Sequence, residues 1–121
     1  MVERSPVPRL SDMIEAIALV GVEMDGVTPD MLAADRRKRW LVERGLEIVS
    51  EASRHLPDSM KARHPEIPLA KVAGIGNVLR HEYQRIAHDI LWRVVRDNLP
   101  PLERACQEEL AAARAREQGG T

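Results

Sequence analysis

The sequence predicts an all-α protein folded as an antiparallel bundle of four to five helices. Three observations support this prediction: apolar residues recur at helical spacing, no segment alternates apolar and polar residues as a strand does, and prolines and glycines divide the chain into helix-sized segments. At 121 residues the chain has room for a single domain, 1–121. Aromatic residues are only 2% of the chain, so the core must be aliphatic.

The first helix is expected after an extended lead-in. Pro6 and Pro8 predict that residues 1–9 are extended, because proline disfavours helix at and before its own position. Apolar residues at helical spacing then predict a helix that ends at Gly26.

A second helix begins at Thr28, which caps it, and Pro29, which takes its first position. Because residues 31–56 contain no proline, the pattern predicts one unbroken helix to Leu56. Two adjacent apolar columns form a wide stripe, which is typical of a helix packed on more than one neighbour. The columns are Leu41, Ile48, Ala52 and Leu56, and Val42, Leu46, Val49 and Ser53.

The second half of the chain predicts a helical turn over 60–64, a helix over 69–85 and a last helical segment over 88–116. Pro100 and Pro101 must kink this last segment or split it in two. The polar residues 115–121 predict a frayed tail.

Composition excludes several classes of protein. The net charge is −1, so no general positive field attracts nucleic acid. The single cysteine, Cys106, excludes an intrachain disulfide and predicts a reducing compartment. The longest apolar run, 16–22, is too short to span a membrane, and the N-terminal residues have no apolar core of a signal peptide. We therefore expect a cytoplasmic protein with no membrane partner.

The densest polar cluster lies in residues 74–83. On a helix, Asn77, Arg80, His81 and Gln84 share one face. An imidazole can move protons near neutral pH, and a guanidinium can hold a phosphate, so this face suits phosphodiester chemistry. The alternative is that these side chains only solvate the surface of a helix.

The sequence resembles the HepT-like branch of the HEPN family, which comprises RNase toxins encoded beside a small MNT-type nucleotidyltransferase. The similarity runs through almost the whole chain. It is carried by residues 10–17, 34–37, 46–52, 63–68, 72–83, 90–92 and 97–100.

The resemblance implies an all-α homodimer in which two polar helix faces form one cleft. It implies metal-independent RNA cleavage in which the RNA 2′-hydroxyl attacks its own phosphate. His81 matches the histidine of the family motif. Tyr83 matches the tyrosine to which the partner nucleotidyltransferase, the antitoxin of the pair, transfers AMP to silence the nuclease.

One position departs from the family motif. Asn77 matches the polar residue that follows the motif arginine, but the arginine position, five before His81, is Gly76. Arg80, directly before His81, does not reproduce the motif, but it is predicted to substitute for the missing arginine in the phosphate contact. The alternative function is therefore a non-catalytic helical partner or regulatory subunit of a nucleotidyltransferase. A third interpretation is a helical dimer that binds a nucleotide or RNA fragment in an unrelated role. Gly76 itself is expected to permit a close helix–helix approach or to leave room for a ligand.

Two other features have alternative interpretations. The basic run 36–39 can contact RNA or an acidic partner, although such a run is more often a solvated helix face. The four histidines, His55, His64, His81 and His88, lack the spacing of metal ligands, so no metal or other cofactor is expected.

Overall fold

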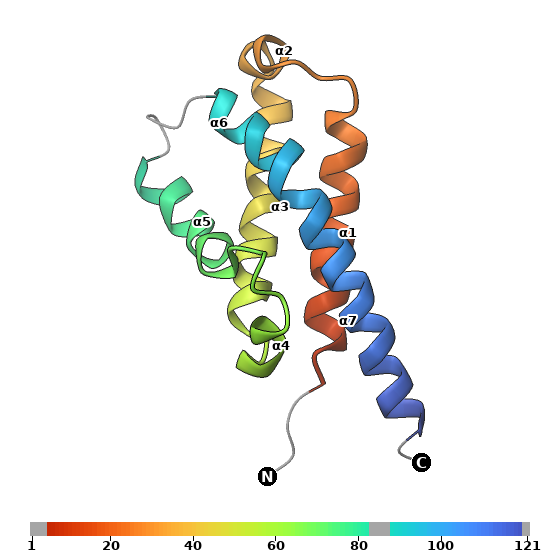
Figure 1. Ribbon diagram of the computed structural model, residues 1–121. Helices are drawn as coiled ribbons and strands as arrows, with labels where there is room; N and C mark the ends of the chain where they lie inside the picture. The colour runs from red at the N-terminus through yellow and green to blue at the C-terminus, as the bar shows by residue number, and fades with distance from the viewer. Residues whose placement is uncertain (1–4, 83–87, 120–121) are drawn as a thin grey trace.

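The computed structural model confirms the all-α fold (Figure 1). It describes residues 5–82 and 88–119, with the backbone alone for 78–82 and Asp89, and these ranges contain no strand. The long helices are α1 (Val7–Met24), α3 (Arg36–Arg54), α5 (Leu69–Glu82) and α7 (Leu99–Gly119). The short helices are α2 (Pro29–Ala34), α4 (Asp58–Ala62) and α6 (His88–Arg93), and a π-helical stretch, η1 (Val94–Asn98), joins α6 to α7.

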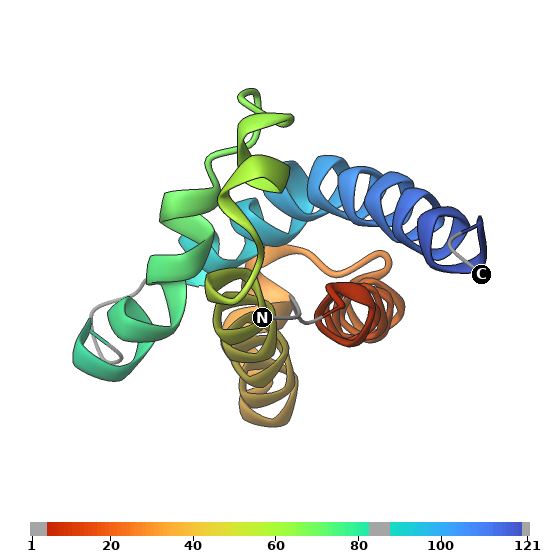
Figure 2. The ribbon, with the colours of Figure 1, turned by 90° about the horizontal axis from the view of Figure 1, so that it is seen from below.

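The long helices lie in the order α5, α3, α1 and α7 across the molecule (Figure 2). Thus α3 packs against both α1 and α5, and α1 packs against both α3 and α7. Each of these neighbours runs antiparallel to the next (Figure 1). Short connections explain why α3 lies beside α1 and α5 beside α3, whereas α7 packs against α1, which is not the long helix before it in the chain.

The first helix begins earlier than the sequence predicts. Residues 7–9, expected in the extended lead-in, already belong to α1, and Pro6 occupies the N-cap position. Proline is tolerated in the first turn, because the N–H that it lacks would have no partner within the helix. The hydroxyl of Ser5 accepts a hydrogen bond from the Val7 amide at 3.1 Å and so satisfies one donor of that turn.

The second predicted helix is divided in two at Asp35. Thr28 caps α2 as expected, with its hydroxyl accepting from the Met31 amide at 3.2 Å. Asp35 then leaves the helical conformation and caps α3, accepting from the Lys38 amide at 3.0 Å. An aspartate stabilises a helix start more than it stabilises a helix interior, which explains a break without proline or glycine.

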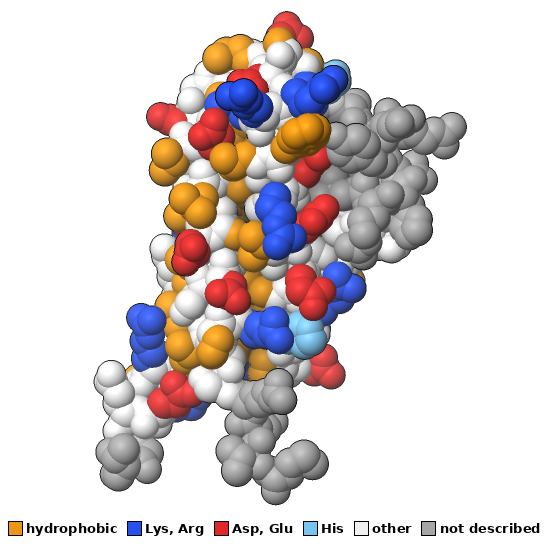
Figure 3. Space-filling view, turned by 180° about the vertical axis from the view of Figure 1, so that it is seen from behind, with side chains coloured by type: hydrophobic (Ala, Val, Ile, Leu, Met, Phe, Trp, Pro, Cys, Tyr) orange, Lys and Arg blue, Asp and Glu red, His pale blue; other side chains and the backbone are white. Residues whose placement is uncertain are grey.

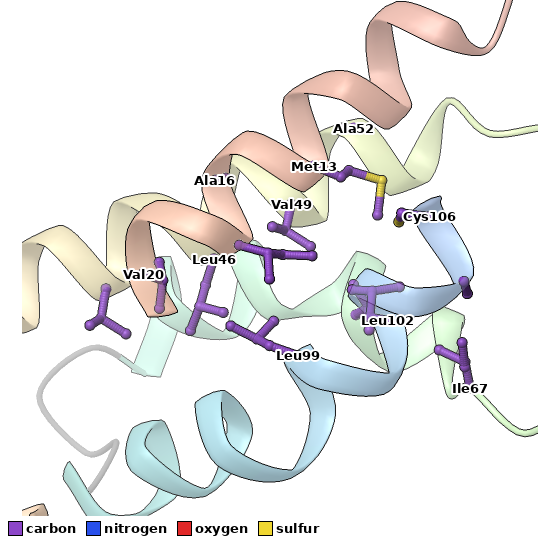
Figure 4. Packing of buried hydrophobic residues seen from close by; sticks show 14 of the residues in the cluster. Met13, Ala16, Val20, Leu46, Val49, Ala52, Ile67, Leu99, Leu102 and Cys106 are labelled. Carbon is purple, nitrogen blue, oxygen red and sulfur yellow. The ribbon is translucent and has the colours of Figure 1, made fainter. Parts of the chain in front are cut away.

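The core lies where α1, α3 and α7 meet (Figure 4). Only one of the two apolar columns on α3 is buried throughout, since Leu41 is 40% exposed and Ile48 is half-buried. Gly45 is buried where α3 crosses α1, and a Cβ atom there would collide with the Val20 side chain. Buried side chains of this core include Leu10, Met13, Val20, Val42, Leu46, Val49, Leu99, Leu102 and Cys106.

The last segment is helical throughout 88–119, but the π-helical stretch η1 interrupts its α-helical pattern directly before the two prolines. Both Pro100 and Pro101 lie in the first turn of α7, and η1 precedes them. The helix α7 continues to Gly119, so residues 115–119 are helical where a frayed tail was expected. In the part of the chain that is described, no helix is long and apolar enough to cross a membrane.

Candidate functional site

The helix that carries the predicted site, α5, is fastened to α3 by one buried side chain. The Ser50 hydroxyl donates to the Ala73 carbonyl at 2.6 Å and accepts from the Gly76 amide at 3.2 Å. Ser50 is fully buried. Because this hydroxyl bonds two successive turns of α5, it sets both the position of α5 and its rotation about its own axis.

Gly76 and Asn77 lie on different sides of α5. Gly76 is buried beside α3, whereas Asn77 is exposed. This supports the expectation that Gly76 permits a close helix–helix approach. The position at which the family motif has its arginine is therefore in the contact between α3 and α5.

The remaining site residues are only partly placed. Arg80 and His81 belong to the last turns of α5, so they share one helix with Asn77 as predicted. Their side chains are outside what the structure describes, and Tyr83 lies wholly outside the described residues. The convergence of these side chains on one cleft, and the dimer that would form it, remain predictions.

The four residues of the basic run 36–39 have two kinds of environment. Two of them join helices to one another, and the other two are exposed. Lys38 donates to the Glu23 carboxylate at 2.7 Å and to the Glu23 carbonyl at 3.1 Å, which joins α3 to α1. Arg39 donates to the carbonyls of Leu32 and Ala33 at the end of α2. Arg36 and Arg37 are exposed.

A cluster of ionisable side chains that the sequence did not predict lies at the opposite end of the bundle. The carboxylate of Glu109 accepts hydrogen bonds from Arg63 at 2.7 and 3.0 Å, and lies 2.7 Å from Nε2 of His64. Both oxygens of Glu109 are thus occupied, and its side chain is 9% exposed. These bonds make the carboxylate a structural anchor and leave it poorly suited to act as a base. Partners 45 and 46 residues apart leave no local sequence signal.

Among the described residues, no group of three or more histidine, cysteine, aspartate or glutamate side chains is arranged to hold a metal ion. The thiol of Cys106 is buried, and burial raises its pKa to about 12, with smaller contributions from Glu103 and Glu109. A thiol with such a pKa is not a nucleophile near neutral pH.

Comparison with known proteins identifies the family. The sequence profile described as Ribonuclease HepT-like matches residues 13–109, which is most of the chain. The chain belongs to the HepT-like ribonuclease family. It is 33% identical over 101 residues to a protein of Thermococcus cleftensis named "Probable ribonuclease HepT", covering 84% of this chain and 92% of the relative. It is 26% identical over 107 residues to a "Putative RNase" of Caldanaerobacter subterraneus subsp. tengcongensis, covering 88% and 96%. No solved structure matches the chain.

The HepT-like match begins inside α1 and ends inside α7, so it takes in the helices that form the core and the whole of α5. Asn77, Arg80, His81 and Tyr83 all fall within it. The match also ends at Glu109, the carboxylate that holds Arg63 and His64.

Proposed function

We propose that this protein is an endoribonuclease that cleaves RNA without a metal ion. The observation that carries the proposal is the family match across α5, in which His81 lies one helical turn after the exposed Asn77. Relatives that align with more than four fifths of the chain are named as ribonucleases. An imidazole is the side chain best suited to move a proton near neutral pH.

In this reaction the substrate supplies its own nucleophile. The imidazole of His81 takes the proton of the RNA 2′-hydroxyl, and the 2′ oxygen bonds to the adjacent phosphorus as the bond to the 5′ oxygen breaks. The products are a 2′,3′-cyclic phosphate and a 5′-hydroxyl. The departing 5′ oxygen must gain a proton, and a homodimer that brings two copies of α5 to one cleft would supply a second imidazole for that step.

The phosphate contact is assigned to Arg80, with Asn77 orienting the phosphate or the 2′-hydroxyl. Gly76 has no side chain to offer and is buried against α3. A guanidinium beside the scissile phosphate stabilises the negative charge that develops in the transition state. Arg80 is the arginine nearest to His81 along α5 and is therefore our candidate for this contact.

We further infer that the nuclease is the toxin of a cytoplasmic toxin–antitoxin pair. The partner would be an MNT-type nucleotidyltransferase that transfers AMP to the Tyr83 hydroxyl. Adding AMP two residues from His81 would place negative charge where the RNA phosphate must bind, so the modified protein would be silent. The support for this regulation is the match of Tyr83 to the family motif.

The decisive experiment compares RNA cleavage by unmodified wild-type protein with cleavage by His81→Ala, both in the presence of a chelator. We expect wild type to leave cyclic phosphate ends and the variant to lose at least about 100-fold in rate. His55→Ala is the matched control, because His55 is an exposed histidine at the end of α3, where it lies 3.1 Å from the Glu51 carboxylate. Equal rates for wild type and His81→Ala would refute the assignment of His81.

A second candidate function is favoured by the burial of Gly76, since the motif arginine is missing there. In this case the protein would be a non-catalytic partner of the nucleotidyltransferase. Folded, unmodified wild type would then cleave no RNA, yet it would co-purify with the nucleotidyltransferase and gain the mass of AMP on Tyr83. Failure to bind that enzyme would exclude this candidate.

A further inference from the structure

We propose that the outer face of the N-terminal half of α3 binds single-stranded RNA, with Trp40 stacking on a base and Arg37 and Arg44 contacting phosphates. The inference rests on the proposed function, because it assigns a substrate-binding surface to the same nuclease. We call the surface formed by these three residues the α3 face.

The three residues of the α3 face form one stripe along the helix. Arg37, Trp40 and Arg44 are spaced by three and four residues, so their side chains leave α3 on the same side. All three are exposed, and Trp40 has 54% of its surface accessible to solvent. An indole exposed to this extent keeps apolar surface in contact with water, and a binding partner would cover that surface.

The arginines of this face differ from the neighbouring cations, whose side chains hold helices together. Lys38 and Arg39, in the same basic run, are held by Glu23 and by the end of α2. Arg44 is 72% exposed, and its contact with Glu47 is a long one of 3.5 Å. A surface ion pair of this kind contributes little stability, so a phosphate can replace the carboxylate.

Acidic side chains also lie on this side of α3, where Glu43 and Glu47 alternate with the arginines. Glu47 is the partner of Arg44, and Glu43 is half-buried, with burial raising the pKa of its carboxyl above the ordinary value. Figure 3 shows Lys and Arg side chains where α2 meets α3 and further along this side of the molecule, interspersed with acidic ones.

The α3 face and the predicted catalytic residues lie toward the same end of the molecule. The helices α3 and α5 run antiparallel and are joined where Ser50 meets Gly76 (Figure 1). Trp40 is ten residues before Ser50, about 15 Å along α3, and His81 is five residues after Gly76, about 7.5 Å along α5. An RNA strand that crosses from α3 to α5 would therefore meet both.

RNA fits this surface better than a protein partner does. An aromatic ring between cations is the combination with which proteins hold single strands, since every base can stack and every nucleotide carries a phosphate. The net charge of −1 gives the chain no general attraction for RNA, so RNA binding depends on local cations such as Arg37 and Arg44.

The test is binding of a fluorescent oligoribonucleotide of about 12 nucleotides, with every 2′-hydroxyl methylated so that it cannot be cleaved. Binding by the full chain is followed by anisotropy at several salt concentrations. We expect Trp40→Leu to weaken binding about 5- to 100-fold and Trp40→Phe, which keeps a ring, to weaken it much less. The double variant Arg37→Gln and Arg44→Gln should reduce the salt slope by about 0.7 for each phosphate that is no longer neutralised.

Arg104→Gln is the matched control, because Arg104 is an exposed arginine on α7, whose packing partners are α1 and η1. Circular dichroism melts of each variant exclude misfolding. If the α3 variants bind the oligoribonucleotide as tightly as the Arg104→Gln control does, the inference is wrong. The proposed nuclease activity is not affected by that result. Absence of binding by wild type would also overturn it, and cleavage of unmethylated RNA then decides the nuclease separately. If Trp40→Leu releases the nucleotidyltransferase and leaves RNA binding unchanged, the α3 face is a protein contact and the inference is wrong.

Discussion

The guanidinium of Arg63 holds the carboxylate of Glu109 through two parallel hydrogen bonds, from Nε to Oε2 at 3.0 Å and from Nη2 to Oε1 at 2.7 Å. His64 adds a third contact to the same carboxylate. Together they fasten the segment that follows α4 to the middle of α7. Because α5 starts only a few residues later, this anchor also fixes the entry of the helix that carries the predicted site.

Replacing Glu109 tests how much this anchor stabilises the fold. We expect Glu109→Gln to lower the free energy of unfolding by about 1–3 kcal/mol, because it weakens charge-assisted hydrogen bonds to a buried acceptor. Urea denaturation measures this change. Glu108→Gln is the control, since Glu108 is the exposed neighbour on α7 and should change stability by less than about 0.5 kcal/mol. Equal effects of the two variants would show that the anchor is energetically unimportant.

The anchor also predicts an acid dependence of stability. The hydrogen bond from Arg63 lowers the pKa of Glu109 below its ordinary value of 4.5, more than burial raises it. A carboxyl with a lower pKa in the folded state stabilises the protein fully above the unfolded pKa and loses this contribution as the pH falls through the folded pKa. We expect the free energy of unfolding to fall below about pH 4.5, and less steeply in Glu109→Gln. Identical pH profiles for both proteins would contradict this. A residual slope is expected in each, since the pKa values of Glu51 and Asp97 are also lowered, by His55 and Arg96 respectively.

The crossing of α1 and α3 predicts a coupled pair of substitutions. Gly45→Ala should destabilise the protein by about 1–3 kcal/mol, because the added methyl group collides with Val20 in a packed core. Adding Val20→Ala removes the obstacle, so the double variant should be less destabilised than the sum of the two single variants. A double-mutant cycle from denaturation curves measures the coupling, and strict additivity would refute the proposed collision.

The attachment of α5 to α3 predicts that Ser50 affects the site as well as stability. Ser50→Ala removes both bonds to α5 and should cost about 1–2 kcal/mol. If α5 carries the nuclease site, the variant should also cleave RNA more slowly at a temperature where it remains folded. Ser53→Ala is the control, because Ser53 is equally buried but bonds only to the Ser50 carbonyl of its own helix. A Ser50 variant with unchanged cleavage would mean that the position of α5 does not limit the reaction.

The reactivity of the buried Cys106 thiol measures how readily the contact between α7 and α1 opens. Burial raises the pKa of Cys106 to about 12, so the folded protein should react hardly at all with a thiol reagent at pH 8. In urea the same cysteine, the single one in the chain, should react completely. Labelling followed by mass spectrometry gives the ratio of the reaction rate in the folded protein to the rate in urea. Rapid labelling of folded protein would mean that the contact between α7 and α1 opens readily.

Particular helix boundaries show which predictions rested on local chemistry. Thr28 and Pro29 start α2, and the double proline at 100–101 lies in the first turn of α7, because caps and prolines act on the turn in which they lie. The errors arose where two local preferences compete. Pro6 and Pro8 suit both an extended chain and a first helical turn, and Asp35 suits both a helix and a cap.

The all-α class, the apolar faces and the family to which α5 and its histidine belong follow from the amino-acid sequence, because periodicity and motifs are properties of neighbouring residues. The roles that depend on distant partners required the packed helices. Packing placed Gly76 against Ser50, joined Arg63 to Glu109, and separated Lys38 and Arg39, which hold helices together, from the exposed Arg36 and Arg37. These pairings depend on how whole helices pack and rotate, and no local pattern of residues encodes that geometry.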